Sequence, residues 1–206
     1  TLERVVALGP EHVAAYSIQV EEGTALARWL REGRPPRGGL PGEDAVAEMY
    51  SLAREVLAVA GYEHYEISNF ARPGFRSRHN QIYWRNGDYL GLGPGASSHL
   101  AGRRWTNERR LDRYRAALAA GRLPVAEAEG ADRAREMSDT VILGLRLLEG
   151  VSLADFRRRF GTDLLDVYGP AVRELRDLGL LALEDGRLRL TPRALPVANR
   201  VFVRFL

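Results

Sequence analysis

Apolar residues recur at helical spacing in three stretches of the first half of the chain. Residues 2–8 show this spacing, and Gly9 followed by Pro10 is a typical helix end. A short helix is expected over residues 25–31. A longer apolar stripe predicts a helix over residues 43–60. The first half is therefore expected to contain three helices.

Two largely apolar runs bounded by turn-forming residues predict strands over residues 12–20 and 62–69. With the helix 43–60 between them, they form a strand–helix–strand unit. Such a unit implies a parallel sheet with a right-handed crossover. The chain from residue 70 to about residue 105 shows no regular pattern and is expected to be irregular.

The second half reads mainly as helix. Helices are expected over residues 108–120, 132–148, 152–160, 170–178 and 192–205. Ser152 begins one of them as a capping residue, and Pro170 is expected to open another. Asp185-Gly186 between two short apolar runs predicts a hairpin over residues 180–190. Helices followed by a hairpin and a closing helix indicate a winged-helix-like domain from residue 132 onward.

Composition excludes several kinds of chemistry. The chain has 206 residues and no cysteine, so its own thiolates cannot hold an iron–sulfur cluster or a zinc ion, or form a disulfide. All 30 basic residues are arginine, which excludes a lysine Schiff base and a Walker-type phosphate loop. The net charge is only +3 with 27 acids interspersed, so charge gives little reason to expect nucleic-acid binding.

Aromatic residues, histidines and glycines gather between residues 61 and 99, a mixture that suits a pocket for a large planar ligand. His79 could be a hydrogen-bonded loop residue or an axial ligand. Its neighbours are Tyr83 and Trp84, which offer stacking surface, and Arg76, Arg78 and Arg85, which could pair with propionates. A porphyrin requires these residue types. Asn80 is expected to hold the imidazole tautomer. The other histidines, His12, His64 and His99, are expected to be structural.

Two further patterns have alternative interpretations. Gly91, Gly93 and Gly95 are spaced G-x-G-x-G, which disfavours a dinucleotide-binding fingerprint and leaves a tight turn or a ligand-lining loop. The run of arginines at 157–159 and the helix after Pro170 could read nucleic acid. The arginines of that helix are each followed by an acid, so a structural role is favoured.

Residues 79–84 read His-Asn-Gln-Ile-Tyr-Trp and fit the H-N-x-x-Y-W signature of HemW-type proteins. These are radical S-adenosylmethionine (SAM) proteins related to oxygen-independent coproporphyrinogen III oxidase. Similar flanking segments lie at residues 61–73, 88–96, 143–151 and 190–206. The chain therefore resembles this family over essentially its whole length.

The resemblance implies an α/β fold: the C-terminal part of an incomplete (β/α)6 TIM-like radical SAM barrel, followed by a helical, winged-helix-like domain. The implied domains are the end of the barrel with the HNxxYW segment (1–105), a connecting helix and loop (106–131) and the C-terminal domain (132–206). It also implies an N-terminal half-barrel that this chain lacks. That half would carry the three cysteines of a [4Fe–4S] cluster and most contacts to SAM.

The function implied by the resemblance is that of a haem chaperone, which binds haem and transfers it to respiratory-chain proteins. His79, Asn80, Tyr83 and Trp84 are the implied haem-binding residues. The alternative is an oxidase of porphyrin biosynthesis. True oxidases of the superfamily lack the hexapeptide, so its presence favours a chaperone over an oxidase. A winged-helix nucleic-acid-binding module is a third interpretation. No catalytic residue and no cluster ligand is expected in this chain. A cytoplasmic protein that binds no nucleic acid and associates peripherally with a membrane is expected.

One position departs from the family pattern. HemW-type proteins usually place a histidine directly after the Gly-x-Gly-Ala segment, whereas this chain has Ser97-Ser98, with His99 two places later. Ser97 and Ser17 resemble SAM-proximal positions in the oxidase relatives and are carried over as candidate cofactor-binding residues.

Overall fold

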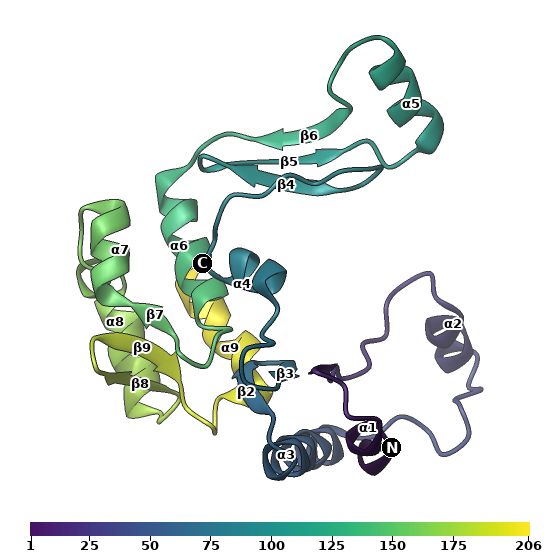
Figure 1. The fold of residues 1–206 in the computed structure, drawn as a ribbon, viewed down its shortest axis with the longest axis vertical. Coiled ribbons are helices and arrows are strands. Elements are labelled where there is room, and N and C mark those ends of the chain that lie inside the picture. The colour runs from purple at the N-terminus through teal and green to yellow at the C-terminus, as the bar shows by residue number, and fades with distance from the viewer. The chain divides into compact units, whose positions relative to one another are not determined.

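The computed structural model describes residues 1–206, which form two compact units, Thr1–Arg76 and Ser77–Leu206 (Figure 1). Unit 1 contains α1 (Leu2–Leu8), β1 (His12–Ala14), α2 (Ala25–Arg31), α3 (Glu43–Val59), β2 (Glu63–Glu66) and β3 (Asn69–Ala71). Helices α1, α2 and α3 match the helices that the apolar spacing predicted. Gly9 ends α1 in the left-handed conformation, with φ 63°.

The small sheet of unit 1 differs from the prediction. Its strand order is β1-β3-β2, and both pairings are antiparallel. β1 and β2 therefore do not pair directly as the predicted parallel unit requires, because β3 lies between them. The predicted strand 62–69 is instead a tight hairpin, and the predicted strand 12–20 is regular only over its first three residues.

The hairpin forms because side chains at its tip bond to the turn. The Glu66 carboxylate accepts hydrogen bonds from the backbone N–H of Ser68, at 3.0 Å, and from the side-chain amide of Asn69. These local bonds stabilise a turn where the apolar run alone suggested continuous strand. The core of unit 1 packs α3 against this sheet through Leu57, Tyr62 and Phe70.

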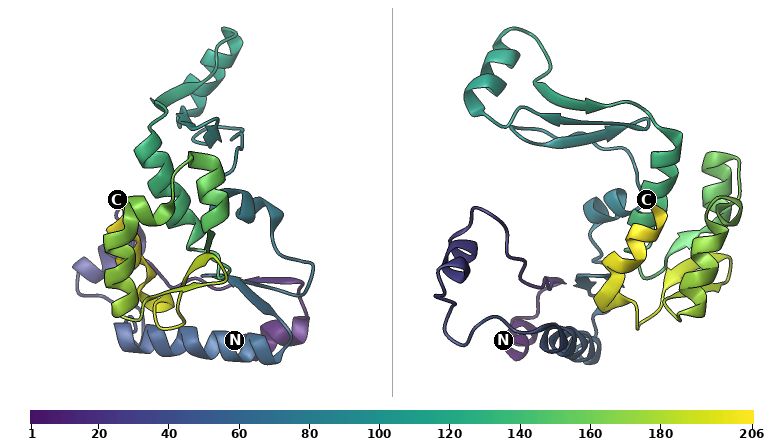
Figure 2. Two further views of the ribbon diagram at one scale, coloured as in Figure 1. Left: turned by 90° about the vertical axis from the view of Figure 1, so that its left-hand side faces the viewer. Right: turned by 180° about the vertical axis from the view of Figure 1, so that it is seen from behind.

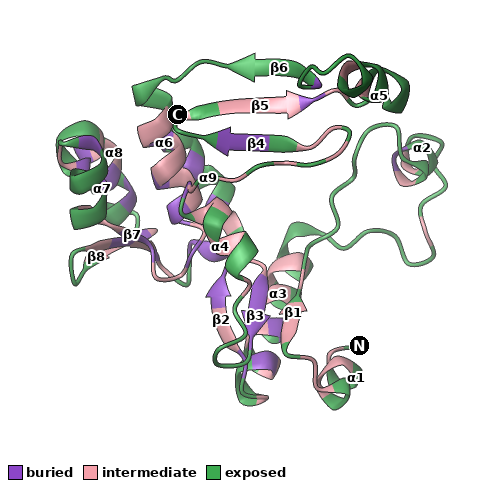
Figure 3. Cartoon of the chain, turned by 45° about the horizontal axis from the view of Figure 1, so that its top comes forward, coloured by how far each residue is buried: buried purple, intermediate pink, exposed green.

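Unit 2 begins with α4 (Arg78–Trp84), followed by a three-stranded antiparallel sheet of β4 (Ser97–Leu100), β5 (Arg103–Asn107) and β6 (Val125–Glu129). Helix α5 (Leu111–Ala119) lies between β5 and β6, and the sheet extends away from the other helices of this unit (Figure 2). β6 is exposed throughout (Figure 3).

The expectation of irregular chain from residue 70 to 105 was therefore wrong for β3, α4, β4 and most of β5. The apolar pattern missed all three strands of this sheet, because β4 reads Ser-Ser-His-Leu, β5 reads Arg-Arg-Trp-Thr-Asn, and β6 contains only short apolar residues and glutamates.

The rest of unit 2 has winged-helix topology. It contains α6 (Arg133–Gly144), β7 (Val151–Ser152), α7 (Leu153–Phe160), α8 (Leu164–Asp177), β8 (Leu181–Glu184), β9 (Arg187–Leu190) and α9 (Ala198–Phe202). The strands form a sheet of order β7-β9-β8. The predicted hairpin is confirmed, with Asp185 and Gly186 at φ 50° and 69°.

The helix boundaries of this region agree with the prediction at the start of α7 and differ at α8 and at the closing helix. Ser152 caps α7, because its Oγ accepts from the backbone N–H of Asp155 at 3.1 Å. Pro170 does not open α8 but lies inside it, since the helix begins at Leu164. The closing helix is divided into a 3-10 turn at Leu195–Val197, α9 and a second 3-10 turn.

The structural division at residue 76 differs from the predicted boundaries at 105 and 131. Residues 77–105 belong with the C-terminal part of the chain because α4 packs against α6 and the sheet leads directly into α6. The predicted boundaries at residues 105 and 131 follow the family resemblance and stay predictions.

Candidate functional site

The HNxxYW segment forms α4, a short helix with a well-defined start and end. Ser77 begins it, because its Oγ accepts from the backbone N–H of Asn80 at 3.2 Å. At the other end, Asn86 N–H bonds to Tyr83 O and Gly87 N–H bonds to Ile82 O, both at 2.9 Å. This pair of bonds around a left-handed Asn86 is a Schellman motif. The sequence signals that could have identified this helix are Ser77 at its start and Asn86 after its end, because serine favours helix starts and asparagine tolerates the left-handed conformation.

His79 and Tyr83 lie on one face of α4, one turn apart. The His79 ring is exposed, and its Nε2 lies 2.7 Å from the Tyr83 hydroxyl. The two rings meet edge to face, with centroids 4.7 Å apart. Tyr83 in turn packs edge to face against Tyr89, at 4.5 Å. The partner that orients the imidazole is therefore Tyr83, not Asn80 as the sequence suggested.

Trp84 lies on a different side of the helix. It follows His79 by five residues, which is a rotation of about 140° around a helix axis. Its ring is half-buried beneath the guanidinium of Arg146 on the loop after α6, at 4.4 Å. The indole Nε1 is buried without a hydrogen-bond partner. Of the four predicted haem-binding residues, the structure thus brings His79 and Tyr83 together and turns Trp84 toward α6, with Asn80 half-buried between them.

A cavity of about 530 Å³ borders the Trp84 side of this helix. Its walls come from the end of α4, α6, β7, α7 and β9. Leu147, Val151 and Phe156 form an apolar floor, and the arginines at its rim are Arg85, Arg158, Arg159 and Arg187. The size is within the range of small-molecule pockets.

The glycine-rich loop is a tight turn whose polar groups are already paired. Gly91 N–H donates to Ser98 Oγ at 2.9 Å, and Asn107 Nδ2 donates to Gly91 O and Gly93 O. A Cβ at Gly91 would lie 2.2 Å from Ser97 O, so only glycine fits there. These contacts favour the tight-turn interpretation of the loop.

The two candidate SAM-proximal serines are both exposed. Ser97 lies on β4, where its hydroxyl is 3.0 Å from that of Thr106, and it lines a smaller cavity of about 270 Å³. Ser17 follows β1 in unit 1, in chain without regular structure. The expected role of Ser17 and Ser97 near SAM stays a prediction.

The other histidines are held by their surroundings. His64 stacks on Phe70, with ring centroids 4.3 Å apart, and its Nε2 is 3.1 Å from Ile67 O. Burial lowers the pKa of His64 to about 4, and the nearby Arg54 acts in the same direction. Burial also raises the pKa of its neighbour Tyr50 to about 12. His12 bonds to the Tyr65 hydroxyl at 2.8 Å, and His99 is fully buried.

Residues that could hold an iron–sulfur cluster are not present. The chain contains no cysteine, and no group of three or more His, Cys, Asp or Glu side chains is placed to hold a metal ion. A cluster therefore does not fit this chain. No helix is both long and apolar enough to cross a membrane.

Comparison with known proteins identifies relatives over the whole chain. The HemN C-terminal domain family matches residues 131–197. The chain is 36% identical over 206 residues to the heme chaperone HemW of Lactococcus lactis, covering 100% of this chain and 53% of the relative. It is 37% identical to the heme chaperone HemW of Mycobacterium tuberculosis, covering 98% of this chain and 49% of that protein. The chain thus spans about half the length of these curated relatives.

A solved structure with the same fold is the coproporphyrinogen III oxidase HemN from Escherichia coli, a radical SAM enzyme. The TM-score is 0.76 at 16% identity, covering 100% of this chain and 50% of that one. The chain therefore has the α/β fold of a radical SAM enzyme's C-terminal half: the last part of an incomplete barrel followed by a helical, winged-helix-like domain. The chain belongs to the HemW-type family and corresponds to about half the length of these relatives.

Proposed function

We propose that the protein containing this chain is a haem chaperone that binds haem through α4 and passes it to haem-accepting respiratory proteins. The support is the name of the relatives, heme chaperone HemW, together with the HNxxYW segment. The observation that carries the proposal is the exposed imidazole of His79 on a capped helix, oriented by Tyr83 at 2.7 Å.

This geometry suits an axial ligand. An imidazole that coordinates iron usually has its other nitrogen or its ring orientation fixed by a neighbouring group. If Nε2–H donates to the Tyr83 hydroxyl, Nδ1 carries the lone pair and lies free for iron. Tyr83 and Tyr89 next to it supply flat apolar surface against which a porphyrin could pack. Trp84 and Asn80 would contribute from the adjacent side of the helix.

The remaining parts of the family's chemistry are proposed to come from outside this chain. An N-terminal half-barrel would supply the [4Fe–4S] cluster and most of the SAM site, and Ser17 and Ser97 would lie near SAM. Peripheral association with a membrane would bring the protein to its acceptors. The domain boundaries at 105 and 131 and a cytoplasmic location belong to the same proposal.

An oxidase of porphyrin biosynthesis shares the fold but, in its true members, not the hexapeptide. A nucleic-acid-binding role for the winged-helix-like region has less support, because many of its cations face acids. Arg157 pairs with Asp163 and Arg158 pairs with Asp155. A phosphate-binding surface needs uncompensated cations.

The test is haem binding by the intact protein and its His79→Ala variant. We expect the variant to bind haem at least tenfold more weakly and to shift the Soret band, because an iron–nitrogen bond is lost. Gln81→Ala, at a variable position of the same hexapeptide, should retain both affinity and spectrum. An unchanged spectrum and affinity in His79→Ala would return His79 to a structural role.

A further inference from the structure

Three consecutive arginines on α7 look equivalent in the sequence, but the structure separates the third from the others. The side chains of Arg157 and Arg158 are 71% and 76% exposed, and each pairs with a nearby acid. The Arg159 side chain is only 35% exposed. It reaches away from α7 to the turn that follows α4. A general surface role therefore does not account for Arg159.

Arg159 binds the end of α4 directly. Its guanidinium donates to Asn86 O at 2.9 Å and to Arg85 O at 3.4 Å, and it also pairs with Glu136 of α6. The next carbonyl, Gly87 O, accepts from His99 Nδ1 at 2.9 Å. Three successive carbonyls at this helix end are thus satisfied by side chains from other elements of unit 2.

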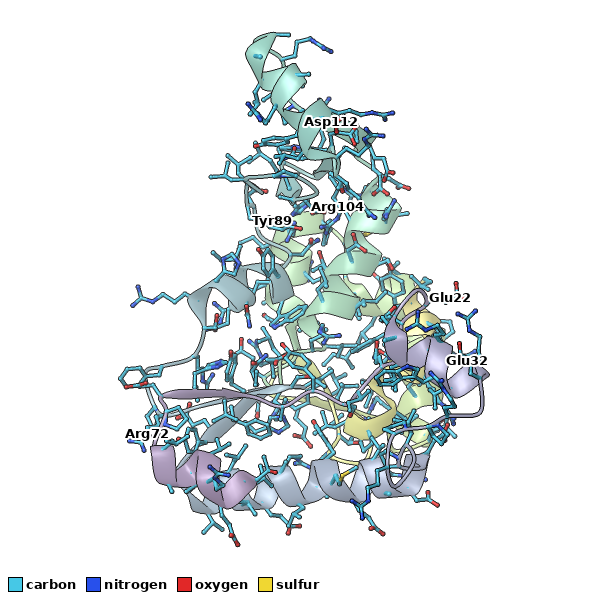
Figure 4. The ribbon with its side chains drawn as sticks, turned by 90° about the vertical axis from the view of Figure 1, so that its right-hand side faces the viewer. Glu22, Glu32, Arg72, Tyr89, Arg104 and Asp112 are labelled. Carbon is cyan, nitrogen blue, oxygen red and sulfur yellow. The ribbon has the colours of Figure 1, made fainter.

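The side chain of Asn86 is held as well. Its amide nitrogen donates to Thr140 Oγ1 of α6 at 3.0 Å, and its amide oxygen accepts from Arg104 of β5. Arg104 is fixed by Asp139 at 3.1 Å. Arg104 lies where the sheet approaches α6, and Figure 4 labels it together with Tyr89. Asn86 itself is 1% exposed. We call Arg159, His99, Thr140 and Arg104 the α4 clamp.

Helix α4 depends on such contacts. It has only seven residues, and an isolated helix of that length is not stable in water. The carbonyls of Arg85 and Asn86 lie just past its last residue and have no partner within the helix, and a cation there also interacts favourably with the helix dipole. Asn86 adopts the left-handed conformation, which is unfavourable for most residues other than glycine, and the clamp stabilises the turn at this position.

We propose that Arg159 is a positioning residue for the haem site. By bridging two carbonyls and Glu136, its planar fork fixes the rotation of α4, and with it the direction in which His79 and Tyr83 face. This inference rests on the proposed function. It assigns the winged-helix-like region a specific task, because α7 belongs to that region and carries no residue of the hexapeptide.

The experiment compares Arg159→Gln with Arg158→Gln in the intact protein. Arg159→Gln is expected to weaken haem binding about tenfold, which corresponds to roughly 1.4 kcal/mol. It should also broaden or shift the Soret band, because His79 would no longer meet iron in one geometry. Arg158→Gln, an exposed neighbour with the same change in charge, should alter neither. Arg159→Lys should recover only part of the loss, since one ammonium cannot reproduce a planar fork.

A double-mutant cycle separates positioning from general stability. In a His79→Ala background, Arg159→Gln should produce little further loss of haem affinity, because both changes act on one ligand. Additive losses, or equal effects of Arg158→Gln and Arg159→Gln, would overturn the positioning role of Arg159 and leave the proposed function intact. If His79→Ala itself leaves haem affinity and the Soret band unchanged, the proposed function and the positioning role of Arg159 fail together. The melting temperature of each variant shows that binding is measured on folded protein.

Discussion

Unit 1 and the winged-helix-like region, residues 132–206, bury their apolar residues very differently. The buried apolar side chains of unit 1 are few and centre on Leu57 and Phe70. The winged-helix-like region contains most of the buried apolar side chains of the whole chain, contributed by each of its helices and strands. One region therefore has a core of its own, whereas the other has a small sheet with a single main helix against it.

The exposed apolar residues show the same contrast. Tyr16, Ile18 and Val20 of unit 1 are 68%, 74% and 44% exposed, although they continue the apolar run that begins in β1. Apolar residues in a strand-like pattern are normally covered by another layer. We therefore infer that unit 1 is an incomplete structural element, while residues 132–206 can fold without further partners.

The largest expected effect comes from separating the two regions. A protein consisting of residues 132–206 alone should unfold cooperatively, because its core is complete. Residues 1–76 alone should aggregate or remain largely unfolded, since small domains with little buried area are marginal. Circular dichroism during heating tests both. A cooperative transition in residues 1–76 would contradict the contrast.

The next effect is the loss of a core ring in the stable region. Phe156 is 1% exposed and packs against Phe160, with ring centroids 4.7 Å apart. Phe156→Ala should reduce the free energy of unfolding of residues 132–206 by about 3–5 kcal/mol. Chemical denaturation measures this change. Val203→Ala, at a 58% exposed position, is the control and should change it by less than about 1 kcal/mol.

A smaller effect is expected from pH in unit 1. The folded pKa of His64 is lowered to about 4, so the unfolded chain takes up a proton more readily between pH 6.5 and 4. Stability contributed by His64 should therefore be present above pH 6.5 and decrease as the pH falls to about 4. After allowance for partial solvent exposure, we expect a loss of about 2 kcal/mol.

The His64→Gln variant isolates this contribution. Tyr50 and Arg54 remain beside the substituted position, so the variant should lose the histidine-dependent part of the acid destabilisation and keep the rest. Hydrogen exchange of the β2 and β3 amides between pH 7 and 4.5 provides the measurement. Identical pH profiles for the two proteins would show that His64 is not buried in its neutral form.

The sequence predicted the elements whose signals are local. Gly9, Ser152 and Asp185-Gly186 marked a helix end, a helix start and a hairpin, and the structure confirms all three. The family and its fold were also identified, because the hexapeptide and its flanks are distinctive. Local signals suffice for these features because capping and turn formation involve residues only a few positions apart.

What the sequence did not predict depends on distant contacts. The antiparallel insertion of β3 requires a turn stabilised by Glu66, and β6 forms only because β5 is there to pair with it. Within the candidate site, helical spacing alone would have separated His79 from Trp84. The clamp residues Arg159 and His99, distant in sequence from each other, gave no such signal.

The hydrogen bond between His79 and Tyr83 has a consequence for the kinetics of haem exchange. In the opposite tautomer to the one that leaves Nδ1 free for iron, the Tyr83 hydroxyl donates to Nε2 at 2.7 Å. Iron that binds Nε2 must then displace this hydroxyl, which can return when haem leaves. The competing hydrogen bond would lower the net affinity for haem. Because affinity differences between related complexes lie mostly in the dissociation rate, residence times should be shorter than for an unpaired imidazole. A tyrosine one helical turn away would thus make the site suited to temporary occupancy, as the transfer of a cargo requires.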